Sequence, residues 1–159
     1  MSSGAVIAIF TTPLHGHATQ PQQSVRVVPG LGIEGDRYFG PSGTPGKREG
    51  GGRDVTLIAI EALQALESEQ QVHLEPGKAR RNIVTQGVAL NELVEQEFQV
   101  GPVTLRGLRL CEPCDYLAGM TDGRVLPGLV HRGGLRSEIL TEGVISVGDP
   151  IIITSPGQV

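Results

Sequence analysis

The feature that most constrains the fold is a series of short apolar runs, each ended by glycine or proline. These two residue types account for 23 and 11 of the 159 residues. Residues 103–110 alternate between apolar and polar side chains, the period expected of a strand with one buried face. Further β-forming runs predict strands at residues 6–10, 25–28, 54–59, 81–86, 135–140 and 150–154.

Helical spacing is confined to few segments. Apolar residues recur with helical period over residues 60–70, and residues 90–94 suit a turn or two of helix. Residues 40–53 hold six glycines, which excludes a helix and predicts a long flexible loop. Strands and helices do not alternate as in a doubly wound fold. We therefore predict one mainly β domain over residues 1–159, an antiparallel β-barrel or curled sheet with a few peripheral helices.

Composition excludes several classes of function. The net charge is −4 and only 3% of residues are aromatic, which argues against a nucleic-acid-binding surface. No apolar run approaches the roughly 20 residues of a membrane span, so we expect no membrane association and a cytoplasmic location. Two cysteines cannot form a disulfide framework, and in a reducing compartment they are expected to be free thiols or ligands.

Residues 30–35 match the pattern G-x-G-x-x-G. That pattern indicates a dinucleotide site only where a helix opens within it, and Gly40-Pro41 prevents such a helix here. We therefore interpret the glycines as turn residues with positive φ. The turn is followed by an acid and a cation, Asp36 and Arg37, which are candidate site residues.

Cys111 and Cys114 form a C-x-x-C pair after the 103–110 strand. A redox dithiol normally opens a helix, and the residues that follow are poor helix formers. A structural zinc site needs four ligands, and His15 and His17 are the remaining candidates, nearly a hundred residues away. A single functional thiolate and a pair of inert buried thiols stay open as alternatives.

Arginine is frequent in the segments on either side of the cysteines. The flanking residues are Arg80, Arg81, Asn82, Arg106, Arg109, Arg132 and Arg136. Arg132 and Arg136 enclose a Gly-Gly pair whose backbone N–H groups suit an anion, and arginine adds a planar fork that fits phosphate. A thiolate close to such a cluster would be stabilised.

The ordered set of motifs resembles the MOSC domain, the domain found at the C-terminus of molybdenum cofactor sulfurases. The resemblance spans about residues 25–153, and the matching segments are residues 30–38, 54–58, 81–84, 111–114, 132–136 and 143–151.

The resemblance implies a β-barrel that binds molybdenum cofactor, a pterin bearing a phosphate and a dithiolene-held metal. It makes Cys114 the metal ligand, with Cys111 at a secondary position. Arg81, Asn82, Arg132 and Arg136 would hold the pterin and its phosphate, and Asp36 and Arg37 complete the candidate set. Soft thiolate suits a soft metal, and arginine suits phosphate.

Three functions follow as hypotheses. The first is a molybdenum cofactor protein that reduces N-hydroxylated substrates with electrons from an external reductase, because the chain has no flavin or iron–sulfur motif. The second is a sulfur carrier in which Cys114 receives a persulfide from a separate cysteine desulfurase, since no pyridoxal phosphate domain fits in 159 residues. The third is a non-enzymatic binding module with structural cysteines. His131 stays outside the candidate set as a solvated residue.

Overall fold

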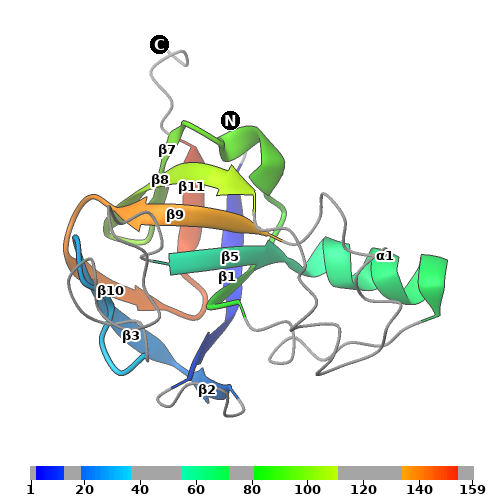
Figure 1. Cartoon of the computed structure of the whole chain (residues 1–159), viewed down its shortest axis with the longest axis horizontal. Coiled ribbons are helices and arrows are strands. Elements are labelled where there is room, and N and C mark those ends of the chain that lie inside the picture. The colour runs from blue at the N-terminus through cyan, green and yellow to red at the C-terminus, as the bar shows by residue number, and fades with distance from the viewer. Residues whose placement is uncertain (1–2, 13–18, 37–54, 72–80, 111–133, 154–159) are drawn as a thin grey trace.

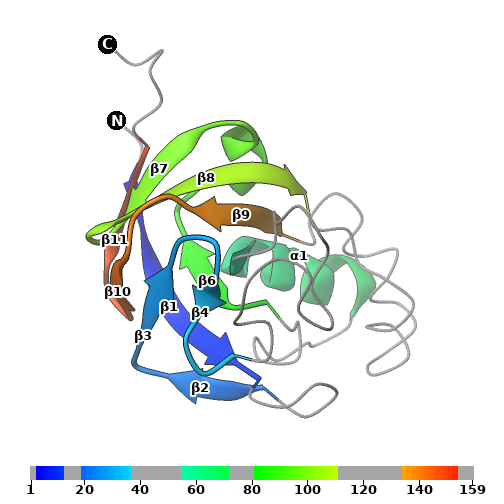
Figure 2. The same ribbon diagram turned by 60° about the vertical axis from the view of Figure 1, so that its left-hand side comes forward.

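A computed structural model describes residues 3–12, 19–36, 55–71, 81–110 and 134–153. The described part is mainly β, with a single α-helix and one short 3-10 helix (Figures 1 and 2). The strands are β1 (Ser3–Thr11), β2 (Gln20–Gln22), β3 (Ser24–Val28), β4 (Gly32–Ile33), β5 (Val55–Ala59), β6 (Ile83–Gln86), β7 (Glu97–Val100), β8 (Val103–Leu110), β9 (Leu135–Ile139), β10 (Gly143–Ser146) and β11 (Pro150–Ile153). The helices are α1 (Ile60–Gln70) and the 3-10 helix η2 (Leu90–Leu93).

Seven of these strands close into a barrel. Their order is β11-β7-β8-β9-β5-β6-β1, and β1 pairs with β11 to complete the ring. Strand β2 extends the sheet from the end of β1, and β10, β3 and β4 form a second small sheet beside the barrel (Figure 2). Closure leaves no long unpaired edge among the seven strands. The prediction of a mainly β, barrel-like fold is confirmed.

Strands β5 and β6 are the parallel pair of the barrel, and α1 forms the connection between them. The apolar side of α1, with Leu63 and Leu66, packs on Ile58 and Val84 from the outer face of this pair. The sequence predicts the helix over the same residues, 60–70, because its apolar residues recur at helical spacing. The parallel pairing of β5 and β6 was not predicted, because the sequence analysis expected an antiparallel barrel.

The barrel core explains the alternating pattern of β8. Val103, Leu105 and Gly107 are buried, whereas the residues between them are partly or fully exposed. Phe98 is completely buried in the same cluster. Each fully buried aliphatic or phenyl side chain contributes roughly 1.5–3 kcal/mol, so the barrel interior supplies the main driving force for folding.

Four strands, β2, β4, β7 and β10, were not predicted. Gly143 opens β10 and Gln20–Gln22 form β2, although neither segment was among the predicted strands. Strand β7 also went unrecognised. These strands are two to four residues long, too short to show a clear period of two. The predicted loop over residues 40–53 lies outside the described residues.

The glycines of the G-x-G-x-x-G segment confirm the turn interpretation. Gly30, Gly32 and Gly35 have φ values of 77°, 109° and 89°. Turns at both ends of β4 are closed by backbone hydrogen bonds, from Leu31 N to the carbonyl of Val28 and from Asp36 N to that of Ile33. The segment therefore forms a turn around a two-residue strand.

Candidate functional site

The segment that carries both cysteines begins and ends at one place on the barrel. Strand β8 ends at Leu110, β9 begins at Leu135, and these two residues are register partners. Figure 1 shows this end of the two strands on the side of the barrel where α1 lies. The predicted site residues Cys111, Cys114 and Arg132 belong to the intervening segment and lie outside the described residues, as does Arg37.

Four polar residues form a row across the outer face of the barrel next to this point. Arg109 of β8 is opposite Arg136 of β9, Arg136 is opposite Thr56 of β5, and Thr56 bonds to Asn82 just before β6. The neighbours of Arg136 in β9, Leu135 and Ser137, are fully buried, so Arg136 lies on the outer surface. We call Arg109, Arg136, Thr56 and Asn82 the polar row.

The half of the polar row on β8 and β9 is cationic. Arg109 and Arg136 face each other across the strands, an arrangement of like charges that is unfavourable by itself. The Nε of Arg136 is buried without a hydrogen-bond partner. Within the described part of the chain, neither arginine has a carboxylate in salt-bridge distance. This half therefore presents two positive charges that the described fold does not neutralise.

A β-bulge sets this pairing. The register between β8 and β9 shifts between Gly107 and Arg109. At Gly107 the chain approaches the segment after η2: Gly107 N donates to the carbonyl of Gln96, and the carbonyl of Gly107 accepts from Glu95 N. A side chain at Gly107 would clash with the carbonyl of Leu93, so glycine permits this approach. The bulge then places Arg109, instead of a neighbour, opposite Arg136.

The other half of the polar row is closed by hydrogen bonds. The Oδ1 of Asn82 accepts from Thr56 N at 3.0 Å and from Thr56 Oγ1 at 3.1 Å. Its Nδ2 donates to the carbonyl of Phe10 at 3.2 Å, and its backbone pairs with both residues as well. Asn82 thus links β1 to β5 at the start of β6. One N–H of Nδ2 remains for a further acceptor.

Arg81 reaches towards the start of β9. Gly134 has a φ of 115°, and a Cβ built there would clash with the carbonyl of Leu57 and lie 3.5 Å from Arg81 Nε. Arg81 therefore passes beside Gly134, which is two residues before Arg136. The glycine is required both by its backbone conformation and by the close approach of β9 to β5.

Asp36 is connected to the closed half of the row. Its Oδ1 accepts a 2.9 Å hydrogen bond from Thr12 N, just beyond the end of β1. Thr12 follows Phe10 by two residues, and Phe10 accepts from Asn82. Four predicted residues are thus connected by contacts with β1, β5 and β9: Asp36, Arg81, Asn82 and Arg136.

Sequence reasoning did not select two members of the row. Arg109 was noted as one of several flanking arginines, and Thr56 was not singled out. The signal for Arg109 was its place two residues before Cys111, at the end of the strand. Among the described residues there is no group of three His, Cys, Asp or Glu side chains able to hold a metal ion. The helices of the described part include none long and apolar enough to cross a membrane.

The family model of the MOSC domain matches residues 35–152, which include the polar row and the whole segment between β8 and β9. The chain belongs to the MOSC domain family. This family is associated with molybdenum cofactor. The resemblance seen in the sequence is thereby confirmed at the level of the family. No curated protein sequence matches the chain.

Solved structures show the same fold. The YuaD protein from Bacillus subtilis superimposes with a TM-score of 0.78 at 17% identity, covering 96% of both chains. YiiM from Geobacillus stearothermophilus gives 0.63 at 16% identity, covering 98% of this chain and 75% of its own. YiiM from Escherichia coli gives 0.62 at 18% identity, with coverages of 95% and 70%. At these identities the likeness concerns the barrel architecture.

Proposed function

We propose that this MOSC chain binds molybdenum cofactor through the cationic half of the polar row and through Cys114. The observation that carries the proposal is the Arg109–Arg136 pair, two arginines in register on neighbouring strands, one of which has a buried Nε without a partner. The pair lies where the segment with both cysteines leaves and re-enters the barrel. A phosphate-bearing ligand and a thiolate-bound metal therefore have candidate partners close together along the chain.

The residues of the row fit a phosphate. A phosphate monoester carries close to two negative charges at neutral pH, which matches two facing arginines. Its oxygens would accept from Arg136 Nε, which otherwise stays buried and unpaired. Arg81 beside Gly134 and the spare N–H of Asn82 supply further donors to the pterin, and Arg132 adds a fourth guanidinium from the cysteine segment. Asp36 and Arg37 stay predictions for the cofactor's polar edge.

Cys114 is the proposed metal ligand, with Cys111 as its neighbour. Thiolate is the form of cysteine that binds metal, and positive charge nearby favours that form. When bound, the cofactor supplies a metal centre that can pass two electrons to a substrate. The proposed activity is reduction of an N-hydroxylated substrate: the N–O bond breaks, two electrons and two protons enter, and amine and water leave. The electrons come from a separate flavin or iron–sulfur reductase.

Metal analysis after expression in a host that makes the cofactor tests the proposal. We expect close to one molybdenum per wild-type chain, loss of the metal in Cys114→Ser, and retention in the matched variant Cys111→Ser. A Cys114→Ser protein that keeps its full molybdenum content would overturn the assignment of Cys114.

The sulfur-carrier hypothesis predicts a different result for the same thiol. Incubation with a cysteine desulfurase and cysteine would add about 32 Da to wild type and nothing to Cys114→Ser, as measured by intact mass spectrometry. If the wild-type chain carries this adduct and no molybdenum, the sulfur-carrier hypothesis replaces the cofactor-binding proposal. Molybdenum without the adduct supports the reductase proposal.

A further inference from the structure

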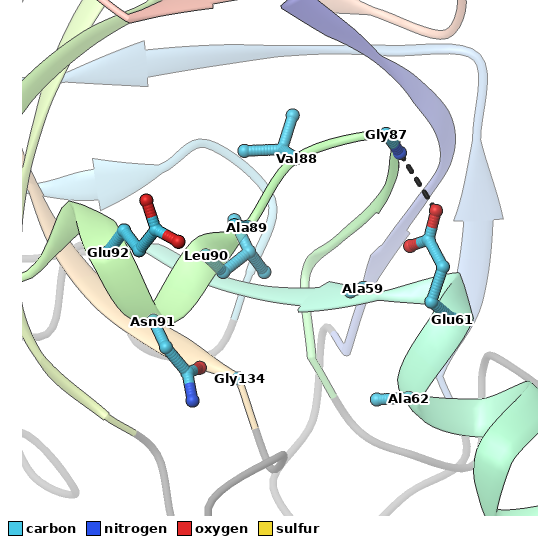
Figure 3. A pocket seen from close by; sticks show the side chains of 10 residues that line it. All are labelled: Ala59, Glu61, Ala62, Gly87, Val88, Ala89, Leu90, Asn91, Glu92 and Gly134. Atoms are coloured by element: carbon cyan, nitrogen blue, oxygen red, sulfur yellow. Dashed lines mark hydrogen bonds between the residues drawn. The ribbon is translucent and has the colours of Figure 1, made fainter. Parts of the chain in front are cut away.

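A pocket of about 510 Å³ opens between α1 and η2, at the end of the barrel where β5 and β6 finish. Its walls are the first turn of α1, residues 87–92 and Gly134 (Figure 3). The floor is apolar, with Ala59, Ala62 and Leu90 among its residues. This volume and this lining are typical of a site for a small organic molecule.

The polar groups of the pocket are mainly acidic. Glu61 of α1 and Glu92 of η2 lie on opposite sides of the pocket, as Figure 3 shows. The described lining residues include no lysine, arginine or histidine. The N-terminal end of α1 adds about half a positive charge, which two carboxylates exceed. The charges of the described lining residues therefore favour a cation.

The carboxylate of Glu61 is held in place by a hydrogen bond from the backbone. Its Oε2 accepts a 2.9 Å hydrogen bond from Gly87 N, drawn as a dashed line in Figure 3, so the carboxylate bridges α1 and the segment after β6. Its Oε1 stays available to a ligand. A carboxylate already fixed by one hydrogen bond loses less conformational entropy when a ligand binds than a freely rotating one.

The pocket adjoins the cofactor region through Gly134. This glycine lines the pocket, and Arg81 Nε lies 3.5 Å from the position a Cβ would take on it. Gly134 directly precedes β9, at the end of the segment with both cysteines. A molecule in the pocket would thus lie next to the proposed cofactor site, on the side opposite in charge to the polar row.

We propose that this pocket binds a small molecule with an apolar body and one positively charged nitrogen group, an amine or amidinium, with Glu61 and Glu92 as its counter-charges. Its use as the substrate subsite rests on the proposed function, whereas the chemistry of its ligand does not. Binding therefore does not require molybdenum cofactor, and the two proposals fail separately.

Ligand-detected and protein-detected NMR titrations of the cofactor-free full chain test the site with three probes of one shape: benzamidine, neutral benzamide and anionic benzoate. We expect benzamidine to bind threefold to tenfold more tightly than benzamide, because both carboxylates are solvent-exposed and partly screened. Benzoate should bind least. The largest amide shifts should fall on Gly87 and residues 89–92.

Two substitutions in the pocket and one outside it complete the test. Glu61→Gln keeps the acceptor for Gly87 N and removes the charge, and Glu92→Gln removes the second charge from an exposed position. Each should remove most of the preference for benzamidine. Glu67→Gln, an exposed position on α1 outside the pocket, changes the net charge equally and should leave the preference intact.

A third substitution tests the volume. Ala89→Phe places a phenyl group in the pocket from an exposed position and should weaken benzamidine and benzamide alike. Equal binding of all three probes, tighter binding of benzoate, or shifts confined to residues outside the pocket would overturn the proposal, whatever the molybdenum content of the chain.

Discussion

The two halves of the polar row adjoin where Thr56 is the register partner of Arg136, yet their polar groups are satisfied to opposite degrees. On one side, Asn82 uses Oδ1 and Nδ2 to connect β1 with β5. On the other side, Arg136 keeps a buried Nε without a partner and faces the like charge of Arg109. Folding alone explains the first half, because its bonds hold the barrel together. The second half costs stability in the absence of an anion, which points to a ligand.

Gly134→Ala should give the largest loss of stability. It tests how closely the chain just before β9 approaches the carbonyl of Leu57 in β5. We expect a loss of about 3 kcal/mol, because the new Cβ clashes with the carbonyl of Leu57 in a conformation that L-residues avoid. Gly30→Ala is the matched control, since Gly30 also has positive φ but nothing within 4 Å of the new Cβ. It should cost about 1 kcal/mol in urea unfolding. Equal losses would remove the argument for close packing at Gly134.

Asn82→Ala should cost about 2–3 kcal/mol. The change removes the acceptor of Thr56 N, the acceptor of the Thr56 hydroxyl and the side-chain donor to the carbonyl of Phe10, and each lost bond costs about 1 kcal/mol. Thr56 Oγ1 still accepts from the backbone N of residue 82. The control Gln23→Ala, exposed between β2 and β3, should stay within about 0.5 kcal/mol of wild type. Chemical denaturation measures both. A stable Asn82→Ala protein would erase the contrast between the two halves of the row.

Arg109→Gln should stabilise the protein by about 0.5 kcal/mol at low salt, because it removes one of two facing like charges. Arg106 lies in β8 just before the bulge, and Arg106→Gln should change the stability in the opposite direction. Arg106 is opposite Glu97 and Glu138, so its loss removes favourable cross-strand pairs of similar size. Both effects should fade in 1 M salt. Equal signs for the two variants at low salt would show that Arg109 is not in an unfavourable field.

Inorganic phosphate should have the smallest effect, a rise in Tm of about 1–2 °C for wild type over chloride of equal ionic strength, since a ligand that binds the folded state stabilises it. The rise should be absent in Arg109→Gln and preserved in Arg106→Gln. Differential scanning fluorimetry gives the comparison. The same rise in all three proteins would assign it to general salt exclusion from the surface.

The sequence was sufficient for elements with a strong local pattern. The period of two in residues 103–110 predicts β8 to the residue, and the helical spacing of residues 60–70 does the same for α1. The barrel followed from the number and shortness of such runs. Strands β7 and β10 were not predicted. Each has four residues and begins with a charged residue or a glycine, so it carries little periodic signal.

The candidate site was harder to predict, because it depends on which strands pair and in which register. Asn82 and Arg136 could be selected by residue type and resemblance. That Arg109 faces Arg136 follows from a bulge between Gly107 and Arg109, which no local pattern encodes. That Asn82 connects β1 with β5 follows from contacts 72 and 26 residues apart in the chain. A one-residue change in register would send these side chains to the other face.

The central claim is that the Arg109–Arg136 pair holds the phosphate of molybdenum cofactor. The most direct test is the pterin and molybdenum content of wild type, Arg109→Gln and Arg106→Gln purified from one cofactor-producing host. Loss of a charge-assisted hydrogen bond of about 1.5–3 kcal/mol weakens binding roughly tenfold or more. We therefore predict that Arg109→Gln retains little pterin or metal while Arg106→Gln retains the wild-type amount. Equal cofactor content in the two variants would contradict the account.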